Sequence, residues 1–242
     1  MTQDNKNKII VPNHVGLIMD GNRRWLKERN LSTLEGHLKG YGKMKEMPEW
    51  FFARGVEIVS VYAFSTENWN RSQTEVNYLM KLLKNALTDD FEEFNSRGYR
   101  LLISGRISEL PGDLPEACVE AMNKTAENDK GILNICINYG GRAEIVDAIR
   151  KMMKNNIEVE QVHEGMIKKY LYQGELPDPD MIVRTSGEQR LSGFQLWESV
   201  YSELLFLKKY WPDFEEDDAE FIIKEYSARK RRFGGDEKTE NT

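Results

Sequence analysis

Hydrophobic and polar positions form alternating blocks along the chain, and these blocks predict strands that alternate with helices. Short runs that are apolar on both faces and rich in β-branched residues are typical of buried parallel strands. Segments with apolar residues every three or four positions predict amphipathic helices. The predicted strands are 14–19, 56–64, 99–104, 132–138, 181–184 and 202–207. The predicted helices are 22–29, 35–52, 73–97, 113–128, 143–154, 166–172 and 217–232.

The alternation predicts an α/β fold, in which a single domain has a mainly parallel central sheet flanked by helices on both faces. No repeat, low-complexity linker or change of composition divides the chain. We expect a disordered N-terminus over residues 1–8, the domain over 9–235 and a disordered acidic tail over 236–242. Pro48 is expected to kink or break the helix in which it lies.

Helix 73–97 is predicted to be the longest, and its apolar stripe is unusually wide. A helix that faces the core explains the stripe by itself. The width also allows a second role, in which the helix lines a hydrophobic channel. The stripe consists of Val76, Leu79, Met80, Leu83, Leu87, Phe91 and Phe94, widened by Tyr78, Leu82 and Ala86.

Composition narrows the functional class. The chain has 242 residues, of which 40% are hydrophobic and 31% charged, so it can bury a core. A net charge of −6 weighs against a general nucleic-acid binder. Two cysteines in unrelated contexts and three histidines without ligand spacing argue against a disulfide framework or a zinc site. Without a secretory signal or a long apolar run, we expect a cytoplasmic protein that is not integral to a membrane.

In a parallel sheet, the ligand site lies beyond the carboxyl ends of the strands. Polar or charged residues follow four of the predicted strands. They occupy positions 20–24, 65–71, 138–142 and the segment from Arg184 onward. We therefore expect these segments to converge at one edge of the sheet.

The first of these segments has the features of an anion site. A buried strand stops at Asp20, a turn at Gly21 follows, and a helix begins with Arg23 and Arg24 in its first turn. The amides at a helix N-terminus, together with two arginines, suit a diphosphate. Asp20 fits such a site only if a cation such as Mg²⁺ lies between the acid and the anion. The alternative is an ordinary turn at the end of a strand.

A second anion site is predicted after the strand 181–184. Arg184 directly follows the strand, and Arg190 and Ser192 lie on a loop that contains Gly187. Two guanidinium groups and a hydroxyl suit an oxyanion with several acceptor oxygens. The alternative is a loop with surface arginines. Two diphosphate sites beside a wide apolar helix point to an enzyme that joins two isoprenoid diphosphates.

The motifs taken together resemble one protein family. The sequences HVGLIMDGNRRW, EGHLKG, YAFSTENWNR, NYGGR, IVRTSGEQRLSGFQLW, WPDF and RRFGG follow one another between residues 14 and 235. This order resembles the cis-prenyltransferase (isoprenyl transferase) family, and within it the bacterial undecaprenyl diphosphate synthases. The resemblance implies the fold of that family, with a hydrophobic tunnel, as a homodimer. It also implies Mg²⁺-dependent condensation of isopentenyl diphosphate onto an allylic diphosphate such as farnesyl diphosphate. The expected product is a Z-polyprenyl diphosphate, namely undecaprenyl diphosphate for the cell-wall lipid carrier.

The resemblance also implies roles for individual residues. Asp20 matches the essential acid and Mg²⁺ ligand, and Glu203 matches a second metal-associated acid that acts across the dimer interface. Asn68 matches the residue that assists loss of the isopentenyl proton, which either Asn68 or the departing diphosphate could accept. The allylic site comprises Gly21, Asn22, Arg23, Arg24, Trp25 and His37. Ser65, Thr66, Glu67, Trp69 and Arg71 flank Asn68. The isopentenyl diphosphate clamp comprises Arg184, Arg190, Leu191 and Ser192.

Some positions depart from the commonest family pattern. Arg23 stands where bacterial members often have glycine, and Thr33 where many have arginine, so Arg23 could supply the missing phosphate contact. Arg106 and Gly193 are further departures. Two alternative functions remain open: a short-chain cis-prenyl diphosphate synthase and a non-catalytic partner subunit. Release of a long lipid product implies transient contact with the membrane, for which the acidic net charge disfavours strong electrostatic docking.

Overall fold

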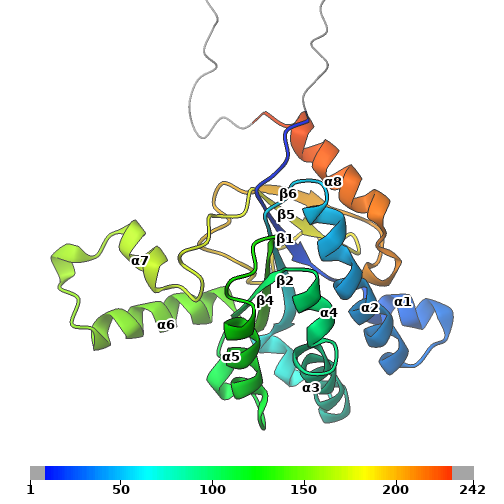
Figure 1. The fold of residues 1–242 in the computed structure, drawn as a ribbon, viewed down its shortest axis with the longest axis horizontal. Helices are drawn as coiled ribbons and strands as arrows, with labels where there is room; N and C mark the ends of the chain where they lie inside the picture. Colours follow the sequence, from blue (N-terminus) through cyan, green and yellow to red (C-terminus); the bar gives the residue numbers. More distant parts are fainter. Residues whose placement is uncertain (1–8, 231–242) are drawn as a thin grey trace, which may run out of the picture.

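The computed structural model describes residues 9–230, which form a six-stranded sheet with helices on both faces (Figure 1). The strand order is β3-β4-β2-β1-β5-β6, and every neighbouring pair is parallel. This confirms the predicted parallel α/β domain. The strands are β1 (His14–Ile18), β2 (Ile58–Ser65), β3 (Arg100–Ser104), β4 (Ile132–Tyr139), β5 (Met181–Arg184) and β6 (Glu203–Phe206). The predicted tails 1–8 and 236–242, and the motif at 231–235, lie outside the described residues.

Eight α-helices connect or cover the strands of the described chain, and short 3₁₀ turns lie between them. None of these helices is long and apolar enough to cross a membrane. The helices are α1 (Asn22–Arg29), α2 (Thr33–Phe52), α3 (Gln73–Leu87), α4 (Phe91–Ser96), α5 (Leu114–Lys124), α6 (Gly141–Lys154), α7 (Glu164–Tyr170) and α8 (Glu216–Ala228). The 3₁₀ turns are η1 (Thr66–Asn70), η2 (Ile107–Glu109), η3 (Val159–Gln161) and η4 (Trp211–Asp213).

The two faces of the sheet carry different cores. Odd-numbered positions of β1, such as Val15 and Leu17, pack into a large core with side chains of α2, α3, α5 and α8. Even-numbered positions, such as Ile18, belong to a smaller cluster with Tyr139 and Phe194 on the opposite face. This alternation is the period of two expected for a strand covered on both sides. Helices α6 and α7 extend away from the sheet, at the left of Figure 1.

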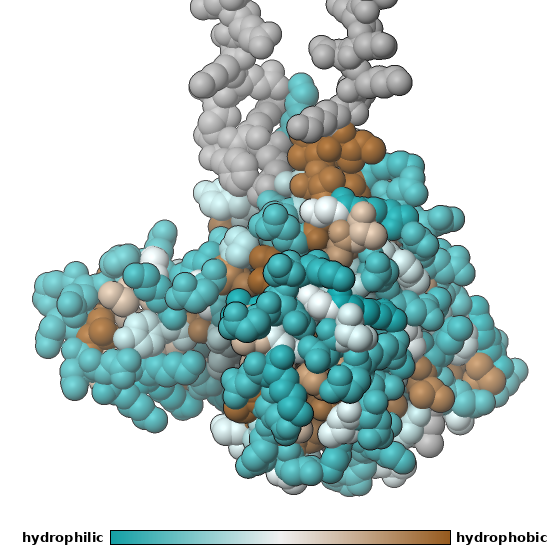
Figure 2. All heavy atoms as spheres, in the orientation of Figure 1, coloured by the Kyte–Doolittle hydropathy of each residue, from teal (hydrophilic) through white to brown (hydrophobic). Residues whose placement is uncertain are grey.

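The surface is mainly hydrophilic on the face seen in Figure 2. A hydrophobic patch on that face lies at the end of the molecule where the N-terminal segment meets α8. Ile9 and Ile10 are exposed in that segment. The amide of Ile10 donates a hydrogen bond to the hydroxyl of Ser227 at 2.9 Å, which joins the beginning of the described chain to α8.

The predicted long helix is two helices, which corrects the expectation for residues 73–97. Helix α3 ends at Leu87, and α4 begins at Phe91. Thr88 leaves the helical region with φ −123° and ψ −78°, and its hydroxyl donates to the carbonyl of Lys84 at 2.9 Å. Thr and Asp side chains compete with the helix for backbone hydrogen bonds, so the sequence Thr-Asp-Asp ends it. The longest helix is therefore α2, with 20 residues.

Pro48 was expected to kink or break its helix; it does not break it, because α2 continues through Pro48 to Phe52, and the kink stays a prediction. Proline removes one helical hydrogen bond, a cost that packing can offset. Met47 and Phe51, which flank Pro48, are completely buried in the large core. Helix α2 also begins earlier than predicted, because Ser32 and Glu35 form a reciprocal capping box.

A row of hydrogen-bonded polar side chains crosses the sheet on the face of the smaller core. The ring of His14 donates from Nδ1 to the carbonyl of Pro177 at 2.7 Å, so its Nε2 accepts from the hydroxyl of Ser60 at 2.8 Å. Asn134 donates to Ser60 at 3.0 Å and accepts from Ser104 at 2.6 Å. The row therefore connects β1, β2, β4 and β3, and it requires a neutral His14.

We expect His14 to make the fold sensitive to acid. Burial lowers the pKa of His14 from 6.5 to about 4, so the unfolded chain binds a proton first as the pH falls. The free energy of unfolding should therefore decrease between pH 6.5 and 4, approaching a loss of roughly 3 kcal/mol from this residue. Urea unfolding at several pH values measures the loss, which should be smaller in His14→Gln. An equal pH dependence in both proteins would contradict this assignment.

Candidate active site

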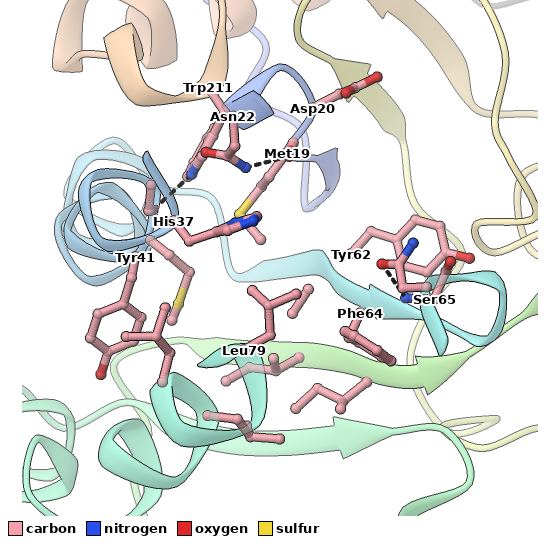
Figure 3. Close-up of a pocket in the computed structure, with 18 of the residues that line it drawn as sticks. Met19, Asp20, Asn22, His37, Tyr41, Tyr62, Phe64, Ser65, Leu79 and Trp211 are labelled. Atoms are coloured by element: carbon pink, nitrogen blue, oxygen red, sulfur yellow. Dashed lines mark hydrogen bonds between the residues drawn. The ribbon is translucent and has the colours of Figure 1, made fainter. Parts of the chain in front are cut away.

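The carboxyl ends of three strands meet around one cavity, as predicted for 20–24, 65–71 and the segment from Arg184, whereas the fourth predicted segment, 138–142, does not line it. The cavity has a volume of about 280 Å³ and is bordered by residues that follow β1, β2 and β5 (Figure 3). Its polar mouth contains Asp20, Asn22, His37, Ser65, Asn68, Arg71, Arg184 and Ser192. Its apolar body includes Ile18, Met19, Tyr41, Met44, Phe64, Leu79, Met80, Leu82, Leu83, Ala86, Ile135 and Ile137.

Helix α3 supplies much of the apolar body. Leu79, Leu83 and Ala86 lie on the stripe that the sequence predicted, and all three line the cavity. The stripe thus serves the cavity as well as the core. The ring of Tyr41 on α2 also borders the cavity, whereas its hydroxyl points away and donates to Asp90 at 2.6 Å (Figure 3). This bond joins α2 to the break between α3 and α4.

The backbone of Asp20 is held in place by Thr185. The amide of Asp20 donates to the Thr185 hydroxyl at 2.9 Å, and that hydroxyl donates to the Asp20 carbonyl at 2.6 Å. The carboxylate accepts from Nη2 of Arg184 at 2.7 Å and lies 3.4 Å from a guanidinium nitrogen of Arg24. Asp20 therefore lies between Arg24, from the first predicted anion site, and Arg184, from the second.

Asp20 is ionised at neutral pH. Burial of its carboxyl group opposes ionisation, but hydrogen bonding and charge from Arg184 outweigh burial and hold the pKa below its usual 3.8. Its side chain is 28% exposed, so the carboxylate remains accessible from the cavity. No group of three or more acidic, histidine or cysteine side chains among residues 9–230 could hold a metal ion. A single accessible carboxylate still fits Mg²⁺, which proteins often bind through one or two acids and substrate phosphates.

The turn after Asp20 requires glycine. Gly21 has φ +107°, and a Cβ there would lie 2.6 Å from Cδ1 of Tyr210 and 2.9 Å from Cβ of Ser186. The first hydrogen bond of α1 runs from the amide of Trp25 to the carbonyl of Gly21 at 2.9 Å. The amide of Gly21 donates to Oδ1 of Asp20 at 2.6 Å, whereas the amides of Asn22, Arg23 and Arg24 have no acceptor within the helix and are available to an anion.

A second cavity, of about 300 Å³, opens in front of these amides. It shares part of its lining with the first cavity and brings further positive charge to the mouth. Arg23 lies on this cavity, where it can supply the phosphate contact expected of it. The lining residues are Met19, Asp20, Gly21, Asn22, Arg23, Arg24, His37 and Arg71.

Glu75, which was not among the predicted site residues, connects two of them. One oxygen of Glu75 lies 3.0 Å from Nε2 of His37 and accepts from Nη1 of Arg71 at 3.0 Å. Burial opposes the charge of Glu75, but these two partners outweigh it and lower its pKa. Burial lowers the pKa of His37 despite the attraction of Glu75, so the ring is neutral at pH 7. The spacing Ser72-x-x-Glu75 is a helix-start signal, but it gave no indication that the carboxylate turns inward.

The segment around Asn68 places some of its residues at the cavity and others beside it. Asn68 accepts a hydrogen bond from the amide of Ser65 at 3.1 Å, and both residues line the cavity. Trp69 donates from its indole nitrogen to Asn138 at 2.8 Å, which joins this segment to the end of β4. Thr66 and Glu67 do not line either of the two cavities.

Arg184 is the centre of the second predicted anion site. Its side chain is only 5% exposed, and its Nη1 donates to the hydroxyl of Ser192 at 2.8 Å and to the carbonyl of Arg190. The side chain of Arg190 is 60% exposed and pairs with Glu188. Leu191 packs against the smaller core on the opposite face. Arg184 and Ser192 therefore line the cavity, whereas Leu191 supports the loop.

Two other predicted residues do not reach the mouth. Trp25 is buried and donates from its indole nitrogen to Asp213 at 2.6 Å. Glu203 begins β6 opposite Met181, so it lies three residues, or about 10 Å, from the strand end marked by Arg184. Its carboxylate pairs with Arg229 at 2.8 Å. One chain thus does not bring Glu203 to Asp20, and a role across a dimer interface stays a prediction.

Comparison with known proteins defines the class to which this site belongs. A family described as putative undecaprenyl diphosphate synthase matches residues 18–234. An isoprenyl transferase of Fusobacterium nucleatum is 43% identical over 225 residues, covering 93% of this chain and 96% of that protein. A Picrophilus torridus protein named tritrans,polycis-undecaprenyl-diphosphate synthase (geranylgeranyl-diphosphate specific) is 44% identical, covering 93% and 90%. The class is therefore that of prenyl-transferring enzymes.

Solved structures agree with the sequence comparison. Lavandulyl diphosphate synthase from Lavandula x intermedia, in complex with dimethylallyl diphosphate, has a TM-score of 0.88 at 33% identity, covering 93% of this chain and 98% of that one. A probable undecaprenyl diphosphate synthase from Campylobacter jejuni has a TM-score of 0.77 at 30% identity, covering 92% and 98%. The chain belongs to the undecaprenyl diphosphate synthase family of cis-prenyltransferases. This confirms the resemblance and the parallel-sheet fold inferred from the sequence motifs, whereas the tunnel and the homodimer stay predictions.

Proposed function

We propose that the protein condenses isopentenyl diphosphate onto an allylic diphosphate, with farnesyl diphosphate as the starter, and produces a Z-polyprenyl diphosphate. The observation that carries the proposal is an apolar cavity with a charged mouth, together with the adjoining cavity in front of the first amides of α1. Gly21, Arg23 and Arg24 lie on one side of Asp20, and Arg184 and Ser192 lie on the other. Two diphosphate groups at the mouth would leave a hydrocarbon chain in the apolar body.

Different residues would serve the binding of each diphosphate and the loss of the proton. The amides at the start of α1 and the guanidinium of Arg24 would hold the allylic diphosphate and stabilise the charge it gains when its bond to the allylic carbon breaks. Arg184 and Ser192 would orient isopentenyl diphosphate, whose terminal carbon forms the new carbon–carbon bond. A proton then leaves the isopentenyl unit. Asn68, at the mouth, would orient the proton acceptor, and the departing diphosphate is the more basic of the two candidates.

Asp20 is the residue that would hold Mg²⁺. Its ionised, accessible carboxylate suits an ion that receives its other ligands from substrate phosphates and water. When bound, the ion would neutralise the negative charge of diphosphate at the mouth. Arg184 would then keep the Asp20 side chain oriented through the hydrogen bond at 2.7 Å.

The length of the product depends on the apolar body. A continuous hydrophobic tunnel would favour a long product such as undecaprenyl diphosphate, the lipid carrier of cell-wall synthesis. A short-chain product is the alternative, since the similar plant structure is a lavandulyl diphosphate synthase bound to dimethylallyl diphosphate. Ala86 lies eleven residues beyond Glu75 on α3, about 16 Å along the helix axis from the mouth, and it lines the cavity.

Product analysis tests the function and the chain length together. We expect the purified protein to convert farnesyl and isopentenyl diphosphates into a long polyprenyl diphosphate, identified by mass spectrometry. Ala86→Leu should shorten the product by at least one isoprene unit, because the larger side chain occupies the deep end of the cavity. Ala126→Leu, at an exposed position, is the matched control. Products limited to one condensation in the unmodified protein would favour the short-chain alternative.

A non-catalytic partner subunit is the remaining alternative. Such a subunit would need neither the metal acid nor the diphosphate clamp. Asp20, Asn68, Arg184 and Ser192 are all present and all line the cavity. Turnover by this chain alone would exclude the alternative, and turnover only after addition of a second, different subunit would support it.

We also propose that the enzyme is a homodimer that associates through β6. This strand is at the edge of the sheet, and Val200, Tyr201 and Leu204, in or just before it, are exposed apolar residues. Exposed edge strands with apolar side chains favour association. A dimer formed there would also bring a partner's surface close to Glu203. A sedimentation mass of 28.2 kDa, that of one chain, would contradict the dimer.

The proposed location is the cytoplasm, with brief contact at the inner face of the membrane when a lipid product leaves. The chain has 34 basic and 40 acidic residues, so a strong electrostatic attraction to anionic lipid is not expected. Flotation with vesicles of anionic phospholipid measures this contact. Firm retention that salt reverses would contradict the weak association proposed here.

A further inference from the structure

One carboxylate, that of Glu188, bridges the two predicted diphosphate sites. Nη1 of Arg24, from the allylic site, donates to Oε1 of Glu188 at 2.8 Å. Nη1 of Arg190, from the isopentenyl diphosphate clamp, donates to Oε2 of the same carboxylate. Glu188 thus occupies donors on both arginines that a phosphate oxygen could use.

The bridge is part of a chain of alternating charges. Arg184 pairs with Asp20 at 2.7 Å, Asp20 with Arg24 at 3.4 Å, and Arg24 with Glu188 at 2.8 Å. Glu188 then pairs with Arg190, whose carbonyl accepts from Arg184 and closes the chain. Three guanidinium groups therefore share two carboxylates, which leaves one net positive charge in the chain.

The backbone of the loop that carries Glu188 is held in place, whereas the side chain of Glu188 can move. The amides of Ser186 and Gly187 donate to the carbonyls of Lys209 and Leu207 at 2.8 and 2.7 Å, which ties the loop to the segment after β6. The side chain of Glu188 is 30% exposed and faces solvent on one side. The carboxylate can therefore leave the two arginines without movement of the loop.

We propose that Glu188 is a shared internal counter-ion that couples the binding of the two diphosphates. The inference rests on the proposed function. A diphosphate at Arg24 competes for the Nη1 donor and repels the Glu188 carboxylate through its own negative charge. Once displaced from Arg24, the carboxylate also releases Arg190. The free energy needed to displace Glu188 therefore weakens the binding of the first diphosphate only. The second diphosphate binds the guanidinium of Arg190 after Glu188 has already left it.

Calorimetric titration measures this coupling. Isopentenyl diphosphate is titrated in the presence of Mg²⁺, with and without saturating farnesyl thiolodiphosphate, an allylic analogue that resists cleavage. In the unmodified enzyme, the analogue should tighten the binding of isopentenyl diphosphate by about fivefold or more. In Glu188→Gln, the factor should fall toward one, and the analogue alone should bind more tightly than to the unmodified enzyme.

Two further variants make the test specific. Glu188→Asp keeps the charge but is one methylene shorter, so it reaches one arginine only and should also lose the coupling. Glu120→Gln removes a carboxylate from an exposed ion pair with Lys124 on α5 and should leave the coupling unchanged. Thermal unfolding of each variant should match that of the unmodified enzyme, since partly exposed ion pairs contribute little to stability.

The outcomes separate this inference from the proposed function. A coupling factor that is the same in the unmodified enzyme and in Glu188→Gln would overturn the inference while leaving the proposed function intact. Loss of coupling together with weaker binding of the analogue would also overturn it, because a displaced counter-ion must weaken the first binding step. Failure of the unmodified enzyme to bind either diphosphate would overturn the proposed function and the inference together.

Discussion

Asp20→Ala should reduce diphosphate release from farnesyl and isopentenyl diphosphates by about a thousandfold. The carboxylate is the proposed Mg²⁺ ligand, and it is ionised because Arg184 outweighs the burial that raises its pKa. Without it, the mouth keeps its positive charge but loses the ligand that fixes the cation. The assay measures inorganic diphosphate released at saturating Mg²⁺, and a chelator added to the unmodified enzyme should have an effect of similar size.

Two controls keep this result interpretable. Asp20→Asn retains the shape of the side chain and should be about as inactive as alanine, which separates loss of charge from loss of packing around the buried Arg184. Asp129→Ala removes an exposed acid just before β4, at the opposite end of the sheet, and should retain full activity. Full turnover of Asp20→Ala would refute the metal assignment.

Arg184→Gln should lower kcat/KM for isopentenyl diphosphate by about a hundredfold. The guanidinium is buried and contacts both Asp20 and Ser192, so its loss affects the clamp and the metal acid together. It is also the group that lowers the pKa of Asp20 against the effect of burial. Since the proposed role of Asp20 requires its ionised form, activity should be lost as the pH falls through the pKa of Asp20. The acidic limb of the pH profile, where activity falls, should therefore move to higher pH in Arg184→Gln.

A pH profile of kcat/KM measures both effects. Arg150→Gln is the matched control, because Arg150 is 67% exposed on α6 and only pairs with Asp147. It should leave both the rate and the profile unchanged. If Arg184→Gln lowers the rate but leaves the acidic limb in place, Arg184 binds substrate without governing the ionisation of Asp20.

The sequence was sufficient to predict the location of the site residues that lie at the carboxyl ends of strands. Asp20, Ser65 and Arg184 each come at or directly after the end of a parallel strand, and such ends meet at one edge by topology. The fold followed from the same periodicity. The exact helix limits did not, since hydrogen bonding by Thr88 and packing around Pro48 decided them locally.

The residues that the sequence could not place are those defined by contacts between distant segments. Glu75 reads as a helix-start residue, but its carboxylate lies against His37, on another helix. Glu188 reads as one acid within a loop, and only the fold brings it to Arg24, which is 164 positions away. Glu203 was assigned by resemblance alone, and a single chain places it away from Asp20.

The strand order has a consequence for how the enzyme matures. β1 pairs with β2 on one side and with β5 on the other, and the bond between Asp20 and Arg184 spans 164 residues. During synthesis, the first four strands emerge long before β5, so the proposed allylic site is made before the proposed clamp. Contacts of such separation form late in folding. We therefore expect prenyl transfer only from nearly complete chains, because a nascent fragment that ends before Met181 would lack Arg184, Arg190 and Ser192, the proposed clamp for isopentenyl diphosphate.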